Sequence, residues 1–72
     1  MNNRTIYRRL GKTIVKLRKQ NNLSQEQLAL DCYIDHSYLS EIKAGKANPS
    51  LKMLNKIARV LDCEIWQLVK EV

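Results

Sequence analysis

Two residues that favour the start of a helix, Ser24 and Asp35, stand only eleven positions apart in this chain of 72 residues. The Ser24 hydroxyl can accept a hydrogen bond from the backbone N–H of Gln27, and the Gln27 side chain can return one to the N–H of Ser24, which makes a capping box. The helix between the two starts is therefore short, at about residues 25–32. This closely spaced pair of helix starts is the strongest constraint on the fold.

The rest of the chain also shows helical periodicity, with apolar residues three and four positions apart. The spacing predicts a first helix at about 5–20, a third at 36–44, a fourth that begins after Ser50 and a fifth at 64–70. Gly45 is placed to end the third helix in a left-handed conformation. The apolar faces comprise Ile6, Leu10, Ile14 and Leu17; Leu39 and Ile42; Leu51, Leu54, Ile57, Ala58 and Leu61; and Ile65, Leu68 and Val69. With no strand signal, the sequence predicts a compact, all-α, five-helix domain.

Length and hydropathy predict one domain over residues 1–72. A chain of this size buries only about 60% of its unfolded surface, so we expect self-association. No apolar run approaches the roughly 18 residues that cross a bilayer, and the first residues lack the apolar segment of a signal peptide. The expected location is the cytoplasm, with no membrane contact.

The residues that could carry catalysis or bind a metal are few. Cys32 and Cys63 are far apart, and His36 is the single histidine, so zinc-site spacings are absent. Both cysteines occupy apolar positions, which is typical of buried thiols. Without a nucleophile and base pair we expect no enzyme activity, no metal, no cofactor and no small-molecule ligand.

Charge is distributed unevenly along the chain, whose net charge is +6. Residues 1–22 carry seven Lys or Arg and no acid, whereas residues 24–42 carry four acids and no Lys or Arg. A basic chain favours a polyanionic partner such as nucleic acid. Arg4, Arg8 and Arg9 could form a basic N-terminal arm, of which residues 1–5 are expected to be flexible. RNA binding would normally use stacking aromatics, which are nearly absent from the first helix.

Several ordered motifs point to a known family: LSQEQLA, then SYLSEI, then AGKANPSL, and finally ARVLDCEIWQLV. Over about residues 10–69 the chain resembles the phage-repressor and Cro-like (XRE) helix-turn-helix family. The resemblance implies a lambda-repressor-like domain whose helix-turn-helix, at about 24–44, is formed by helices 2 and 3. It also implies that the third helix lies in the major groove of double-stranded DNA and that a homodimer binds a two-fold symmetric operator.

Candidate DNA contacts follow from the resemblance and from helix geometry. In the third helix, Ser37, Ser40, Glu41 and Ala44 point away from Leu39 and Ile42. The expected base contacts are His36, Ser37, Ser40 and Glu41, and the expected backbone contacts are Gln25, Tyr38, Lys43, Lys46 and Asn48. Three alternatives stay open here: a solvated His36, a Glu41 paired with a neighbouring cation, and a Tyr38 that covers Cys32.

Two positions depart from the family pattern. Relatives usually have Gly where this chain has Tyr33, so either Tyr33 is strained at positive φ or the turn differs. Relatives usually have Glu where this chain has Lys43, which leaves Arg18 to turn to Glu41, to a helix C-terminus or to DNA.

The fifth helix carries more apolar surface than one face can bury. We therefore expect dimerisation through Ile65, Trp66, Val69 and Val72, although Trp66 could instead cap the core of the monomer. The predicted function is a sequence-specific DNA-binding transcriptional regulator. The alternative is an antitoxin or protein-interaction module that also uses the helix-turn-helix to bind DNA.

Overall fold

Five α-helices build the computed structural model, which describes residues 3–70. They are α1 (Asn3–Gln20), α2 (Gln25–Asp31), α3 (His36–Lys43), α4 (Leu51–Val60) and α5 (Ile65–Val69). Since residues 3–70 contain no strand, the all-α prediction is confirmed. Several helix ends match the predicted ones, and the others differ from them by one or two residues. Residues 3–5, predicted to form part of a flexible arm, belong to α1 instead, and residues 1 and 2 lie outside the described part of the chain.

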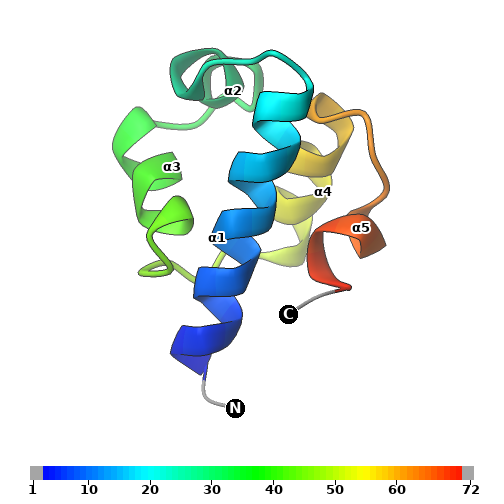
Figure 1. The fold of residues 1–72 in the computed structure, drawn as a ribbon. Coiled ribbons are helices and arrows are strands. Elements are labelled where there is room, and N and C mark those ends of the chain that lie inside the picture. The colour runs from blue at the N-terminus through cyan, green and yellow to red at the C-terminus, as the bar shows by residue number, and fades with distance from the viewer. Residues whose placement is uncertain (1–2, 71–72) are drawn as a thin grey trace.

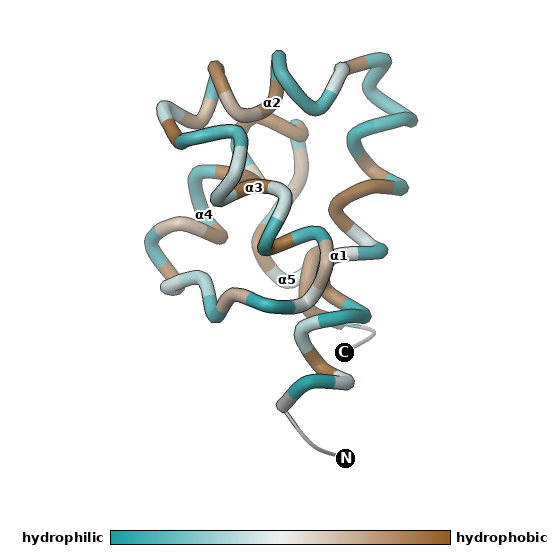
Figure 2. The backbone as a smooth tube through the Cα atoms, turned by 90° about the vertical axis from the view of Figure 1, so that its left-hand side faces the viewer, coloured by the Kyte–Doolittle hydropathy of each residue, from teal (hydrophilic) through white to brown (hydrophobic). Residues whose placement is uncertain are grey.

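The long helix α1 runs through the middle of the domain, with α3 on one side and α4 and α5 on the other (Figure 1). Helix α2 lies across the end of the domain at which α1 finishes (Figure 1). Helix α1 packs against both α3 and α5. Figure 2 shows hydrophobic and hydrophilic residues following one another along each helix.

The core takes apolar side chains from all five helices. Its fully buried members include Ile14, Leu28, Cys32, Leu39, Ile42, Ile57, Leu61 and Leu68. Three predicted apolar-face positions lie outside the core: Ile6 is half-buried, Leu51 is 72% exposed and Val69 is 37% exposed. Leu51 is the first residue of α4, and periodicity alone overestimated its burial.

Helices α1 to α4 all end in the same way. Each end has a residue with positive φ, and two backbone hydrogen bonds form there. The N–H of that residue donates to the carbonyl three residues earlier. The N–H of the next residue donates to the carbonyl five residues before it. The four residues are Asn22 (φ 57°), Tyr33 (φ 57°), Gly45 (φ 76°) and Asp62 (φ 56°). The prediction for Gly45 is confirmed, and three of the four helices end without glycine.

Tyr33 therefore adopts the left-handed conformation itself, which answers one of the two questions left by the sequence. The left-handed region costs a non-glycine residue roughly 1 kcal/mol or more. The Tyr33 ring is 87% exposed, and Lys56 Nζ lies 5.9 Å from its centroid. A cation–π contact at an exposed site contributes about 0.5–1 kcal/mol, which offsets much of the backbone cost.

The helix caps agree only in part with the predicted ones. Ser24 Oγ accepts from the Gln27 N–H at 3.0 Å, but Gln27 Nε2 donates forward to Asp31 Oδ1, so the predicted capping box is half formed. Asp35 precedes α3 and makes no capping hydrogen bond. At α5 the side chain of the third helical residue does reach back, because the Glu64 N–H donates to Gln67 Oε1 at 2.8 Å.

This difference predicts unequal effects for two similar substitutions. Ser24→Ala should lower the free energy of unfolding by about 1 kcal/mol, because it removes a cap. Asp35→Ala should lower it by a smaller amount, about 0.5 kcal/mol, because it removes one exposed hydrogen bond from the Ser37 hydroxyl and no bond to a backbone N–H. Urea denaturation of both variants tests the difference, with Ser50→Ala, which removes the bond from the Met53 N–H, as a positive control. Equal losses for Ser24 and Asp35 would contradict this assignment.

Candidate nucleic-acid interface

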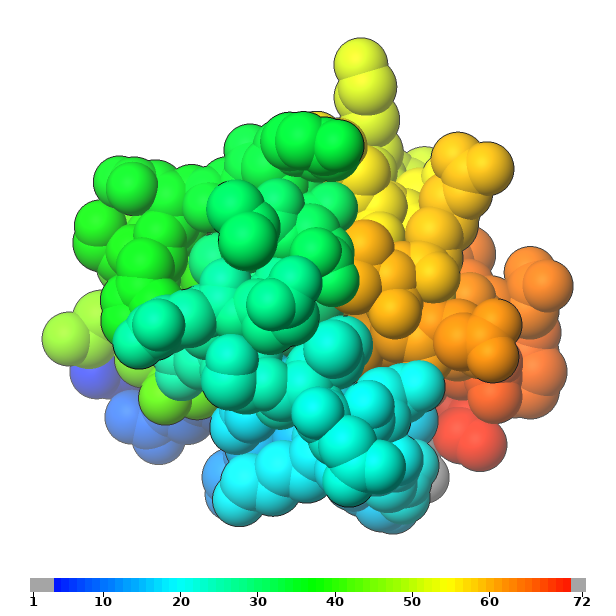
Figure 3. All heavy atoms as spheres, turned by 90° about the horizontal axis from the view of Figure 1, so that it is seen from above, coloured from blue at the N-terminus to red at the C-terminus, as the bar shows by residue number. Residues whose placement is uncertain are grey.

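Helix α3 has one buried face and one exposed face, as the sequence predicts. Leu39 and Ile42 are 2% and 1% exposed, and they anchor the helix on the core. On the other side His36, Ser37 and Glu41 are exposed and Ser40 is half-buried. The end of the domain at which α2 lies is seen in space-filling form in Figure 3, where residues of α2 and α3 make one continuous surface. The four predicted base contacts thus share one side of α3.

Gly11 decides how closely α1 approaches α3, and the sequence analysis did not identify it. A Cβ added at Gly11 would lie 2.8 Å from the Ile42 carbonyl oxygen and closer still to that of Lys43. Real Cβ atoms do not approach backbone oxygens so closely, so only glycine permits this contact. The C-terminal half of α3 therefore rests directly on the backbone of α1.

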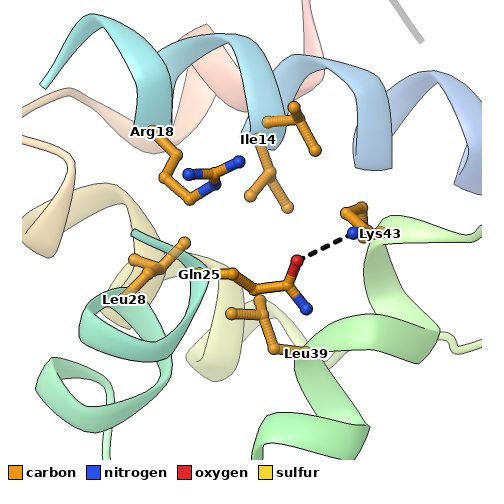
Figure 4. A pocket seen from close by; sticks show the side chains of 7 residues that line it. Ile14, Arg18, Gln25, Leu28, Leu39 and Lys43 are labelled. Atoms are coloured by element: carbon orange, nitrogen blue, oxygen red, sulfur yellow. Dashed lines mark hydrogen bonds between the residues drawn. The ribbon is translucent and has the colours of Figure 1, made fainter. Parts of the chain in front are cut away.

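A polar bridge joins the start of α2 to α3. Lys43 Nζ donates to Gln25 Oε1 at 2.7 Å, and Gln25 Nε2 donates to Ser40 Oγ at 2.8 Å. Arg18, Gln25 and Lys43 converge from three helices over an apolar floor (Figure 4). That floor is formed by Ile14, Leu28 and Leu39. Three predicted contact residues, Gln25, Ser40 and Lys43, are therefore brought together by the fold.

Arg18 has a partner inside the protein. Its Nη1 donates to the backbone carbonyl of Leu23 at 2.7 Å, in a partly buried position. Leu23 belongs to the turn that ends α1. Of the three partners proposed for Arg18, this one is therefore closest to a helix C-terminus, and it is neither Glu41 nor DNA. Arg18 donates to a backbone carbonyl and Lys43 donates to the Gln25 amide oxygen, and both acceptors are neutral. The two cations therefore need no carboxylate between them.

The first turn of α3 is also organised by a side-chain bond. Ser37 Oγ donates to Asp35 Oδ2 at 3.2 Å. Asp35 therefore orients Ser37, although it was predicted to cap the helix. Beside this turn, Glu26, Ala29, Leu30, Ile34 and His36 line a shallow hollow between α2 and α3.

The remaining predicted backbone contacts lie around this surface. Tyr38 is half-buried and packs against the core, while Lys46 and Asn48 are exposed in the loop after α3. Arg4, Arg8 and Arg9 are exposed on α1. A Cβ added at Gly45 would lie 2.7 Å from Arg8 Cγ, so Arg8 packs against the turn that ends α3.

Three of the four predicted dimer residues, Ile65, Trp66 and Val69, lie on α5, away from α3 (Figure 1). Trp66 is 56% exposed and Val69 37% exposed, whereas Ile65 is partly buried against the core. Lys70 Nζ lies 5.4 Å from the centroid of the Trp66 ring. Val72 lies outside the described residues.

Neither cysteine is activated. Burial raises the pKa of the Cys32 thiol, and the neighbouring Asp31 raises it further. Burial, Asp62 and Glu64 likewise raise the pKa of Cys63. Residues 3–70 contain no group of three or more potential metal ligands. No helix in this part of the chain is long and apolar enough to span a bilayer.

Comparisons with known proteins agree with this architecture. The model of the family described as "Helix-turn-helix" matches residues 14–65. Control protein C.MunI of Mycoplasma sp is 38% identical over 65 residues, which cover 89% of this chain and 88% of that protein. The immunity repressor protein of Bacillus phage phi105 is 36% identical over 62 residues, which cover 86% of this chain but only 43% of the repressor.

A solved structure extends the likeness to three dimensions. The restriction-modification controller protein C.AhdI from Aeromonas hydrophila has a TM-score of 0.83 at 35% identity, covering 86% of this chain and 94% of that chain. The family match spans more than half of the sequence, and the relatives are regulators rather than enzymes. The chain therefore belongs to the Cro/C1-type (XRE) helix-turn-helix family of transcriptional regulators.

Proposed function

We propose that this protein binds double-stranded DNA sequence-specifically, as a cytoplasmic homodimer on a two-fold symmetric operator. Helix α3 reads base edges in the major groove through His36, Ser37, Ser40 and Glu41. Gln25, Tyr38, Lys43, Lys46 and Asn48 hold the sugar-phosphate backbone. Control of transcription comes from occupancy of the operator.

The observation that carries this proposal is the composition of the outer face of α3. Its residues are small or polar, and the helix is fixed from behind by Leu39 and Ile42. Hydroxyl, imidazole and carboxylate groups can each bond to base edges. Cations stand at the edge of this face, in Lys43 and Lys46, where phosphates flank a major groove.

Selection of bound sequences from random duplex DNA tests the function. We expect a two-fold symmetric site with half-sites about one helical turn apart. His36→Ala and Ser37→Ala should each relax the preference at particular bases, because each removes a base contact. Tight binding without sequence preference would reject the proposed function.

Lys46 provides a separate test of the backbone contacts. Lys46→Gln should weaken binding to all sequences alike and lower the slope of log K against log salt by about one unit, because one phosphate contact is lost. Arg59→Gln is the control, since Arg59 is exposed on α4, which lies on the other side of α1 from α3 (Figure 1). Titrations at several salt concentrations measure both slopes, and an unchanged slope for Lys46→Gln would reject the contact.

The dimer would form through α5. Trp66 is a large apolar side chain that remains 56% exposed, and Val69 adjoins it one helical turn later. Trp is enriched at the centres of protein interfaces. With α5 on the opposite side of α1 from α3 (Figure 1), pairing through α5 leaves both reading helices accessible.

A further inference from the structure

The two serines on the outer face of α3 are held by internal hydrogen bonds of opposite direction. The Ser37 hydroxyl donates to Asp35, whereas the Ser40 oxygen accepts from Gln25. A serine hydroxyl has one hydrogen to donate and two lone pairs to accept. The internal bond therefore determines what is left for an outside partner: Ser37 keeps lone pairs, and Ser40 keeps its hydrogen.

Lys43 sets the direction of the bond to Ser40. The two ends of the Gln25 amide differ chemically, since the oxygen accepts and the nitrogen donates. An ammonium group only donates, so Lys43, at 2.7 Å, holds the oxygen on its own side. The amide nitrogen is then turned toward Ser40, at 2.8 Å. Without Lys43, the amide could turn over and offer its oxygen to Ser40.

We propose that Lys43, Gln25 and Ser40 form a one-way hydrogen-bond relay that makes Ser40 a hydrogen-bond donor to DNA. Each member donates to the next, and the Ser40 O–H donates to an acceptor on the duplex. Chains of this kind polarise their members, so the terminal O–H becomes a better donor. This inference rests on the proposed function, because it assigns chemistry within the same DNA-reading surface.

The relay restricts which bases fit opposite Ser40. Guanine N7 and O6, adenine N7 and thymine O4 are acceptors in the major groove, whereas the cytosine N4 amino group is a donor. A serine without internal bonds can bond to either kind. The relay thus selects acceptor-bearing edges at one operator position, and the opposite arrangement at Ser37 favours a donor-bearing edge at another. A phosphate oxygen is also an acceptor, and the test separates it from a base.

Gln25→Glu reverses the relay while keeping its size. A carboxylate only accepts, so it would take the hydrogen bond from Lys43 and also the hydrogen of Ser40. Ser40 would then present lone pairs to DNA. In selections from random duplex DNA we expect the preference at one position to move by about five- to tenfold toward donor-bearing bases. Repulsion between the new carboxylate and the phosphates would weaken binding to all sequences alike. It therefore cannot produce a change in base preference at one position.

The Ser40→Ala background is the decisive control. If Gln25→Glu acts through Ser40, it should leave the base preference unchanged in that background. Ser40→Ala could instead weaken binding to all sequences alike, which would mean that the Ser40 O–H donates to a phosphate. In that case Gln25→Glu should cause a smaller loss of affinity in the Ser40→Ala background than in the wild type. Two outcomes would overturn the relay. In the first, Gln25→Glu changes the base preference equally with and without the Ser40 hydroxyl. In the second, Gln25→Glu leaves the base preference unchanged and its effect on affinity is the same in both backgrounds.

Lys43→Met tests the start of the relay. It should reduce discrimination between acceptor and donor bases at the same position as Gln25→Glu, because the amide of Gln25 can then turn over. Lys46→Met is the matched control and should keep that discrimination. If Lys43→Met and Lys46→Met both leave it intact, Lys43 has no part in the relay. Circular dichroism checks that each variant is folded. If the wild-type protein itself selects no DNA sequence, the proposed function is refuted, whereas failure of the relay alone would leave the sequence preference of the wild type in place.

Discussion

Replacing Gly11 with alanine is expected to lower the free energy of unfolding by about 3 kcal/mol, the upper part of the range for overpacked interiors. In an ordinary helix the same substitution would raise stability by roughly 0.5–1 kcal/mol, because glycine loses more backbone entropy on folding. Here the added Cβ would meet the carbonyl oxygens of Ile42 and Lys43, which belong to backbone and cannot rotate away. Steric repulsion therefore outweighs the gain in helix propensity.

A loss of this size is a large part of the total. A domain of 72 residues is stable by roughly 4 to 11 kcal/mol. Thermal and urea unfolding measure the loss, with Lys12→Ala as control because Lys12 is exposed on the same helix. The control should stay within about 0.5 kcal/mol of wild type. An alanine variant at position 11 that is more stable than wild type would show that α3 can move outward without penalty.

Trp66→Glu should convert the proposed dimer to a monomer and weaken operator binding by at least about 100-fold. Binding of two linked half-sites exceeds the affinity for one by roughly 10²- to 10⁴-fold, and a monomer loses this advantage. A carboxylate at the centre of an apolar interface also costs several kcal/mol in lost hydration. The fold itself should persist, because the Trp66 side chain is already 56% exposed in the single chain.

Sedimentation equilibrium and DNA titration measure the two effects together. Leu30→Glu is the matched control for the sedimentation measurement alone, since Leu30 is an apolar residue on α2 with 68% exposure, outside the proposed dimer surface but in the hollow beside His36. It introduces the same charge and should leave the dimer intact. If Trp66→Glu remains dimeric, the interface lies elsewhere. If it unfolds the chain, Trp66 caps the core of the monomer, as in the alternative reading of the sequence.

Sequence reasoning succeeded wherever the physical cause was local. The Ser24 cap, the left-handed Gly45 and the buried pair Leu39 and Ile42 each depend on a few adjacent residues and on the period of the helix. The positive φ of Tyr33 was also anticipated as one of two possibilities. The same reasoning failed where a local rule had competitors, as for Gln27, which bonds forward to Asp31 rather than back to Ser24.

By itself, then, the sequence determined five helices, two of them short and adjacent, and the polar residues that α3 turns outward, because periodicity and helix-start signals act over a few neighbouring residues. Only the tertiary structure decided the partners of Arg18, Gln25 and Lys43 and the need for glycine at position 11. The bonds from Gln25 to Ser40 and Lys43 join residues 15 and 18 positions apart. Their geometry depends on how closely α1, α2 and α3 pack, and residue spacing along the chain carries no information about that distance.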